Sequence, residues 1–386
     1  MRALLVFGAL AGILVAATPT PVAAQPPEVD QEPVGQCTPP SNTPVRQLSW
    51  AQRRMSPERV WPLTGGDVLV GVVDTGVSAQ APALAGAVLP GTDLTGGPGD
   101  GDCFGRGTFL ASLIAARPSA NPDVPFVGLA PAARIFPVRV SDDPPKIRDH
   151  AALAVAIGNG IRAAVDAGAR VVAVGLVATI GVRELDDAVA YAADRDVLVV
   201  ASAAVPRNGQ LAFPARVPGV LAVAPVGPDG PVRNPVYGAA PQLAAPADEL
   251  IGVAPRGNGH RLASSSELAV AFVAGAAALV RDYHPTLSAP EVAARLRDTA
   301  DQPSTSLPNK LVGYGIVNPF AAVTVVPNTD SPATPPAELR VEVPRHATPD
   351  PVPISRALWF AGGIAAAALL VTGPAVAVAA RRRRAP

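Results

Sequence analysis

Five short runs of apolar, largely β-branched residues constrain the fold of this chain more than any other feature. They lie at 67–73, 134–140, 170–177, 197–203 and 220–226. Runs of this length without polar alternation are typical of strands buried on both faces of a parallel sheet. Helix-like stretches separate and follow them, at 108–116, 150–167, 183–194, 266–284 and 289–300. The alternation predicts an α/β fold, with a mostly parallel central sheet, flanking helices and right-handed crossovers.

Asp74 stands directly after the first run, in the stretch Val-Gly-Val-Val-Asp-Thr-Gly-Val. In open parallel sheets, ligand and catalytic sites form at the carboxyl ends of strands. Asp74 is therefore the first candidate for a functional residue. By itself, an Asp-Thr-Gly sequence is more typical of a carboxylate that caps the turn after a strand.

The composition excludes two classes of protein. The chain of 386 residues has 31 basic and 31 acidic side chains and is 49% hydrophobic. These values exclude a strongly basic nucleic-acid-binding protein and a charged disordered chain, so no nucleic-acid partner is expected. The length allows one large domain with appendages.

The N-terminal end has the pattern of an export signal. Arg2 precedes an apolar run over 3–16, and small residues at 22–24 come before Gln25. This pattern predicts a secretory signal peptide at 1–24. The alternative is a retained membrane anchor, but the apolar run is short for a membrane span.

The C-terminal end has the pattern of a membrane anchor. Residues 326–355 are rich in proline and predict a semi-rigid linker. The apolar stretch 356–380 would extend roughly 36 Å as a helix, enough to span a bilayer. The tail 381–386 holds four arginines, which favour the cytoplasmic side. We expect a single-pass type I protein of the cell membrane with its domain outside. A buried core helix is the alternative, but nothing downstream could cover it.

Cys37 and Cys103 are the two cysteines of the chain. In an oxidising compartment they predict one disulfide, which would tie an N-terminal extension, 25–45, to the segment before Arg106. Two free thiols are the alternative. No metal site is expected, because none of the four histidines lies near either cysteine in the sequence.

Several motifs together resemble one protease family. The stretch 70–77 matches the aspartate motif of subtilisin-like serine proteases, the subtilases of peptidase family S8. The stretch 102–118 resembles the histidine motif of mycosins, the membrane-anchored subtilases of type VII secretion systems. Further matches are Trp50-Ala-Gln, Glu58-Arg-Val-Trp-Pro-Leu, the two cysteines, Gly313-Tyr-Gly-Ile-Val-Asn-Pro and the closing apolar segment. The resemblance covers nearly the whole mature chain and implies a subtilisin-like three-layer domain at 46–325.

The resemblance assigns the residues of a catalytic triad, and the chain departs from it. Subtilases need a serine nucleophile, a histidine base and an orienting aspartate. Asp74 takes the aspartate position. Arg106 takes the histidine position, in Gly-Arg-Gly-Thr instead of Gly-His-Gly-Thr. A guanidinium stays protonated at physiological pH, so Arg106 cannot act as the base. None of the histidines at 150, 260, 284 and 346 has a motif that supports it as a replacement.

The nucleophile and oxyanion positions are also substituted. In the stretch Ala263-Ser-Ser-Ser-Glu-Leu-Ala-Val-Ala-Phe-Val-Ala-Gly, the helix that follows sets the register and places Glu267 at the serine position. A slip of one residue would instead make Ser266 the nucleophile, but it loses the alanine match. Val205 takes the position of the asparagine that donates to the oxyanion.

These substitutions form a charge-balanced set. If the triad geometry persists, Arg106 lies between Asp74 and Glu267, and the three side chains form an ionic cluster. We therefore expect a catalytically inactive mycosin-like protein with a structural role in a type VII secretion membrane complex, where self-association is a further expectation. The alternatives are an active serine endopeptidase and a peptide-binding module that does not cleave. No cofactor is expected, and no loop is acidic enough to predict calcium.

Overall fold

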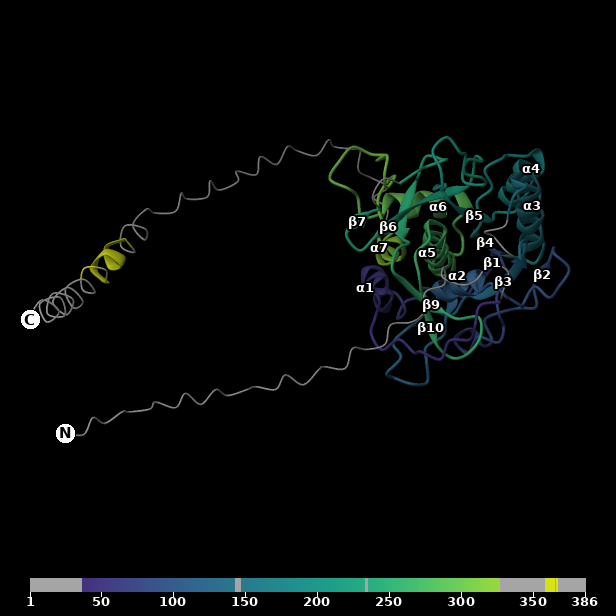
Figure 1. Cartoon of the computed structure of the whole chain (residues 1–386). Helices are drawn as coiled ribbons and strands as arrows, with labels where there is room; N and C mark the ends of the chain where they lie inside the picture. Colours follow the sequence, from purple (N-terminus) through teal and green to yellow (C-terminus); the bar gives the residue numbers. More distant parts are fainter. Residues whose placement is uncertain (1–36, 143–146, 233–234, 327–357, 365, 367–386) are drawn as a thin grey trace, which may run out of the picture. The chain divides into compact units, whose positions relative to one another are not determined.

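The computed structural model of the chain describes residues 37–142, 147–232, 235–326, 358–364 and 366. Within them, eight strands form a central sheet in the order β2-β3-β1-β4-β5-β6-β7, and β8 pairs with β6 (Figure 1). Every pairing is parallel except that of β6 with β7. The strand bounds are β1 Leu69–Asp74, β2 Thr92–Asp93, β3 Arg134–Arg139, β4 Val171–Val174, β5 Leu198–Ser202, β6 Leu221–Gly227, β7 Gly230–Pro231 and β8 Leu243–Pro246.

Strand β1 lies between β3 and β4, and all six of its residues are buried. Its apolar run is needed because helices cover both faces of the sheet. Gly71 allows one of these helices to approach closely: a Cβ atom there would lie 2.5 Å from the Cβ of Ala164. This packing fixes the strand that carries Asp74 at its carboxyl end.

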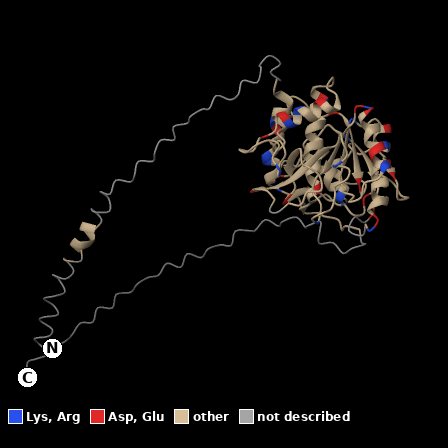
Figure 2. Cartoon of the chain, turned by 90° about the horizontal axis from the view of Figure 1, so that it is seen from above, with Lys and Arg blue, Asp and Glu red and all other residues tan. Residues whose placement is uncertain are grey.

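The helices form a layer on each face of the sheet (Figure 1). Helices α3 and α4 pack on one face, and one hydrophobic core lies beneath them. Helices α2 and α5 pack on the other face, joined by α6 and α7, and the larger core lies there. The helix bounds are α1 Trp50–Met55, α2 Arg106–Ala115, α3 His150–Asp166, α4 Arg183–Ala193, α5 Ala269–Tyr283, α6 Ala289–Asp298 and α7 Pro319–Thr324. Most charged residues of the domain lie on its outer helices and loops, and the central strands are largely uncharged (Figure 2).

The predicted α/β fold with a mostly parallel sheet and flanking helices is confirmed, and the five predicted strands form β1, β3, β4, β5 and β6. Two helix starts differ from the prediction. Helix α2 begins at Arg106, not at residue 108. The predicted helix 266–284 begins as a 3-10 turn, η5 (Ser266–Leu268), and the α-helix starts at Ala269. The sequence did not indicate α1, α7, the short strands β2 and β7, β8, or the antiparallel pair β9 (Leu250–Val253) and β10 (His260–Ala263).

The N-terminal strap, residues 37–45, crosses the β9–β10 pair. The predicted disulfide is present between Cys37 and Cys103. Arg256 donates to the carbonyl of Thr38 at 2.6 Å, and the hydroxyl of Ser41 donates to the carbonyl of His260 at 2.8 Å. The strap therefore connects the start of the domain to the loop that precedes α2.

Several predicted segments lie outside the described residues. These are the signal peptide at 1–24, the first part of the extension at 25–45, nearly all of the linker at 326–355 and the tail at 381–386. Of the stretch 356–380, the residues 358–364 and 366 are described and are helical. Among the described residues, no helix has the length and apolar character needed to cross a membrane.

Candidate functional site

Asp74 is the last residue of β1, and its side chain is completely buried. The backbone N–H of Thr75 donates to Oδ1 at 2.8 Å, whereas Oδ2 has no hydrogen-bond partner among the described residues. Burial raises the pKa of Asp74 above its usual 3.8, although Arg106 and the hydrogen bonds from Thr75 oppose the shift. Arg106 and Thr75 therefore offset only part of the cost of burying the negative charge of Asp74.

Arg106 is the first residue of α2 and reaches Asp74 from there. Its N-cap is Gly105, in the left-handed conformation with φ 86°, so no side chain caps this helix start from the N-cap position. Nη1 of Arg106 lies 3.5 Å from Oδ1 of Asp74. Nη2 lies 3.8 Å from Oε2 of Glu267, and it also donates to the carbonyl of Gly175, just after β4. The guanidinium thus joins β1, β4 and η5 in one place.

Glu267 lies in η5, two residues before the start of α5. The hydroxyl of Ser265 donates to the Oε2 atom of Glu267, the same oxygen that faces Arg106. The predicted position between two carboxylates is thus observed for Arg106. We name Asp74, Arg106 and Glu267 the cleft cluster. Its ion pairs, at 3.5 Å and 3.8 Å, are longer than well-formed charged hydrogen bonds.

The side chains of Val205 and Ser266 make no hydrogen bond among the described residues. The side chain of Val205 is buried in the core under α3 and α4, and its backbone N–H donates to the carbonyl of Val236 at 2.9 Å. The carbonyl of Ser266 accepts a hydrogen bond of 3.5 Å from the buried hydroxyl of Ser202. The isopropyl side chain of Val205 cannot donate a hydrogen bond to an oxyanion. Ser202, at the end of β5, was not predicted as a site residue, because a single serine in an apolar strand gives no signal in the sequence.

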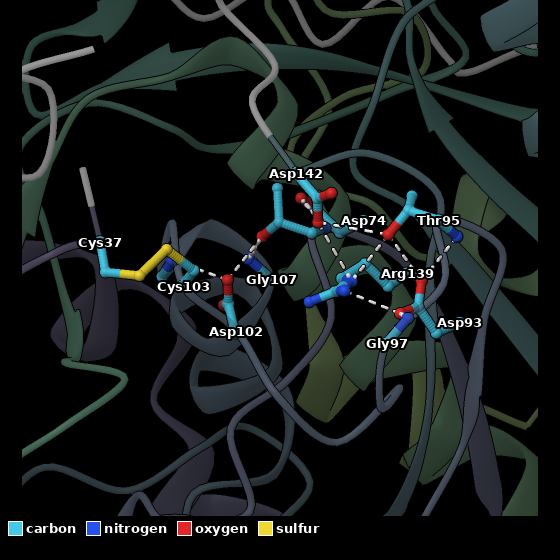
Figure 3. Close-up of polar contacts among 12 residues, drawn as sticks. Cys37, Asp74, Asp93, Thr95, Gly97, Asp102, Cys103, Gly107, Arg139 and Asp142 are labelled. Atoms are coloured by element: carbon cyan, nitrogen blue, oxygen red, sulfur yellow. Dashed lines mark hydrogen bonds and ion pairs between the residues drawn. A yellow bond between two sulfur atoms is a disulfide. The ribbon is translucent and has the colours of Figure 1, made fainter. Parts of the chain in front are cut away.

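A second buried carboxylate, Asp102, is linked to the cleft cluster through Thr75. Asp102 accepts hydrogen bonds from the hydroxyl of Thr75, the hydroxyl and N–H of Thr108 and the N–H of Gly105, at 2.7–2.9 Å. Burial raises its pKa to about 6, against these hydrogen bonds. In Figure 3, Asp102 lies next to Cys103, and Gly107 lies close by. Asp102 accepts from N–H groups at the start of α2, where the N-cap residue has no side chain to do so. The sequence analysis did not single out Asp102, although it directly precedes Cys103.

An outer group of polar side chains lies on the far side of Asp74 (Figure 3). Arg139 pairs in register with Asp74 across β1 and β3. Nη2 of Arg139 lies 2.7 Å from Oδ2 of Asp93, and its Nε lies 3.2 Å from Oδ1 of Asp142. Hydrogen bonds from Thr95, Arg139 and Gly97 outweigh the effect of burial on Asp93 and lower its pKa. These contacts brace the loop after β2 against the end of β3.

The described histidines lie in structural positions. Nδ1 of His260 accepts from the N–H of Val45 at 3.2 Å, and burial lowers the pKa of His260 to about 4. His150 contacts Thr179, and His284 contacts the carbonyl of Val323. His346 lies outside the described residues. Within the described part of the chain, no group of three or more His, Cys, Asp or Glu side chains is placed to hold a metal ion.

The described side chains of the cleft cluster are one guanidinium and two carboxylates. A guanidinium stays protonated at physiological pH and does not accept a proton. What the cluster does provide is charge neutralisation where three elements of the fold meet.

Comparison with known proteins gives the family. Residues 65–315 match the model of the subtilase family, peptidase S8, and the chain belongs to this family. Within it, the chain belongs to the mycosins. It is 31% identical to Mycosin-4 of Mycobacterium tuberculosis over 99% of this chain and 96% of that protein.

Two solved structures are similar over most of the chain. The crystal structure of MycP1 from Mycobacterium smegmatis matches with a TM-score of 0.68 and 25% identity, over 83% of this chain and 96% of that one. A chain in the composite C3 structure of an intact ESX-5 inner membrane complex matches with a TM-score of 0.66 and 29% identity. That match covers 93% of this chain and 97% of the other. The predicted resemblance to mycosins is therefore confirmed.

Proposed function

We propose that this mycosin is a pseudoprotease with a structural role in the membrane complex of a type VII secretion system. The observation that carries the proposal is the pair of contacts by which Arg106 faces both Asp74 and Glu267. On this proposal Asp74 is the retained triad aspartate, and Arg106, Glu267 and Val205 replace the base, the nucleophile and the oxyanion donor. In subtilisin, a protease of the same fold, loss of the serine or the histidine costs about a million-fold in kcat.

The proposed setting is the outer face of the cell membrane. The signal peptide at 1–24 would export the chain, and the span at 356–380 would retain it, with the domain at 46–325 outside and the basic tail at 381–386 inside. The likeness to a chain of the ESX-5 inner membrane complex supports a place in such an assembly. The disulfide is in keeping with an oxidising compartment.

The contacts of Arg106 also favour a structural role over peptide binding. In open parallel sheets, ligands bind where the strands end, and the carbonyl of Gly175 lies directly after β4. Arg106 already donates to that carbonyl. Only 13% of the Arg106 side chain is exposed, so the guanidinium fills the position. A bound peptide would have to displace it.

One observation supports a second candidate, an unconventional serine endopeptidase. The hydroxyl of Ser265 donates to Glu267, which is the contact a nucleophile makes with a carboxylate base. In this alternative Ser265 attacks, in place of the slipped nucleophile Ser266. Neither serine has an oxyanion donor from Val205, which is why we favour the structural role.

The test uses the full-length chain, purified in detergent and compared with an active mycosin. We expect no labelling by an active-site serine probe and no turnover of a protein substrate above the blank. Labelling that disappears in Ser265→Ala or Ser266→Ala would overturn the pseudoprotease assignment and name the nucleophile.

The structural role has a separate test in cells. Deletion of the gene should reduce the amount of intact secretion membrane complex, and the wild-type gene and an Asp74→Asn variant that accumulates to the wild-type amount should restore it equally. Full complex in the deletion strain, or restoration by wild type alone, would contradict a role that is independent of catalysis.

A further inference from the structure

An open hollow of about 500 Å³ lies on the domain surface and includes none of the cleft cluster. Three segments of the sequence line it, and they contribute Leu211, Arg216, Tyr237, Gly238, Ala240 and Lys310. The lining combines apolar side chains with the polar groups of Gln210, Arg216, Tyr237 and Lys310. The proposed function does not use this hollow.

The three segments are connected by hydrogen bonds, so the hollow has a defined shape. The hydroxyl of Tyr237 donates to the carbonyl of Leu311 at 2.8 Å and joins the second segment to the third. The N–H of Gly238 donates to the carbonyl of Ala203 at 2.9 Å and ties the same segment to the residue after β5. Burial raises the pKa of Tyr237 to about 12, so its hydroxyl remains a donor.

Two cations at the hollow have no acidic partner. Arg216 and Lys310 are exposed, and neither side chain makes an ion pair or hydrogen bond among the described residues. The residues that line the hollow include these two cations and no aspartate or glutamate. The lining is therefore positively charged.

Exposed leucines accompany these cations. Leu211 lines the hollow and is 40% exposed, and Leu311, next to Lys310, is 43% exposed. An apolar area bordered by charges of one sign is typical of a protein interaction site. The occupant that matches both properties is a polypeptide with a carboxylate beside an apolar side chain.

We propose that this hollow docks an acidic, partly apolar segment of another protein subunit of the secretion membrane complex. The inference rests on the proposed function, because it names the surface by which the chain would join that complex. A carboxylate of the partner pairs with Arg216 and Lys310, and an apolar side chain beside it packs against Leu211 and the Tyr237 ring. The contact depends on charge, so high salt weakens it.

The test measures how much of the full-length chain co-purifies with an affinity-tagged subunit of the native complex. We expect the double variant Arg216→Glu/Lys310→Glu to lower this amount at least fivefold and Leu211→Ser to lower it about twofold. The matched control is Arg46→Glu/Arg134→Glu, which makes the same charge change at two exposed arginines outside the hollow. The control should co-purify like wild type.

A photo-crosslinking residue at position 240 identifies the occupant. We expect a cross-link to a subunit of the complex, within a peptide that contains aspartate or glutamate, and its loss in the Arg216→Glu/Lys310→Glu background. A cross-link to lipid instead of protein would overturn the proposal in favour of a membrane contact.

Two further outcomes separate this inference from the proposed function. If the double variant melts like wild type and co-purifies at the wild-type amount, the hollow is not the docking site, while membership of the complex stands. If the wild-type chain itself does not co-purify, the proposed function fails and this inference fails with it.

Discussion

Among the arginine–aspartate pairs of this domain, Arg281–Asp196 and Arg106–Asp74 have opposite electrostatic outcomes. Arg281, on α5, places Nη1 2.8 Å from Oδ2 of Asp196 and donates from Nη2 to the Asp196 carbonyl at 2.6 Å. Arg106 lies 3.5 Å from Asp74. Burial acts to raise the pKa of both aspartates. At Asp196 the contacts with Arg281, Ala289 and Arg170 outweigh it and the pKa falls, whereas at Asp74 burial prevails.

The difference shows what a counter-charge needs in order to compensate a buried carboxylate. Arg281 is completely buried and also donates to the carbonyl of Leu287 at 2.8 Å, so short hydrogen bonds fix its position. The side chain of Asp196 is 42% exposed. Asp74 has no such exposure and a more distant partner. The Arg281–Asp196 pair is therefore held by short hydrogen bonds, whereas the ion pairs of the cleft cluster are longer and compensate the buried charge less completely.

The largest effect is expected at the tighter pair. Arg281→Met should lower the free energy of unfolding by about 3–5 kcal/mol, because it removes the short charged hydrogen bonds from the guanidinium to the Asp196 carboxylate and to two carbonyls. Chemical denaturation measures this loss. Arg183→Met, at a side chain that is 90% exposed, is the control and should change stability by less than about 0.5 kcal/mol. If Arg281→Met lowers the free energy of unfolding less than Arg106→Ala does, the cleft cluster is the more stabilising of the two pairs.

Arg106→Ala should cost about 2–3 kcal/mol at pH 8, because it leaves Asp74 buried without its counter-charge. The cost should shrink as the pH falls. The pKa of Asp74 is raised in the folded state, so the proton-linked stability is present below about 3.8 and is lost as the pH rises through the folded value. Thermal melts from pH 5 to 8 measure the trend, with Arg106→Lys as the charge-retaining control. An unchanged melt for Arg106→Ala would contradict the ionic cluster.

Asp102 tests whether hydrogen bonds alone can hold a buried carboxylate, since it has four donors and no guanidinium partner. Asp102→Asn should cost about 1–2 kcal/mol, because an amide cannot accept from all four. The pKa of about 6 lies above the usual 3.8, so wild-type stability should fall as the pH rises through 6, and the variant should lack this step. Carboxyl NMR titration of Asp102 gives the midpoint, and a midpoint below 4 would refute the assignment.

Glu267→Gln should cost less than about 1 kcal/mol, because the ion pair with Arg106 spans 3.8 Å and the glutamate is 22% exposed. The glutamine retains the size of the side chain and can still accept from Ser265. A loss as large as that of Arg106→Ala would mean that Glu267, and not Asp74, is the main partner of the guanidinium.

The smallest expected effect is on catalysis. Glu267→Ser should not give any measurable hydrolysis of a protein substrate, because Arg106 still occupies the position of the base. The control is the same assay on an active mycosin. Turnover by this single variant would mean that the loose cluster can rearrange into a working site.

The sequence predicted the strands and the cleft cluster well, for a physical reason. Buried parallel strands need continuous apolar runs, so β1 and its neighbours are visible as such runs, and Asp74 is fixed by the end of β1. The position of Arg106 followed from the family motif, and the ion pairs with Asp74 and Glu267 followed from its charge.

Other features depend on contacts that a linear pattern does not contain. The contact from Arg106 to the carbonyl of Gly175 joins residues 69 positions apart, and backbone carbonyls leave no trace in composition. The start of α2 at Arg106 depends on Asp102, a residue outside the helix. The antiparallel pair β9–β10 is short, and its residues include Arg261 and His260, which conceal the apolar signal.

The disulfide has a consequence for the order in which the domain assembles after export. Its two cysteines are separated by 66 positions, and both precede β3 and β4, the sheet partners of β1. On the proposed route the N-terminal part of the chain reaches the oxidising side first, so the covalent loop around β1 can close before either partner strand arrives there. Strand β1 would then lie within a covalently closed loop, and β3 and β4 would pair with it after the loop has closed.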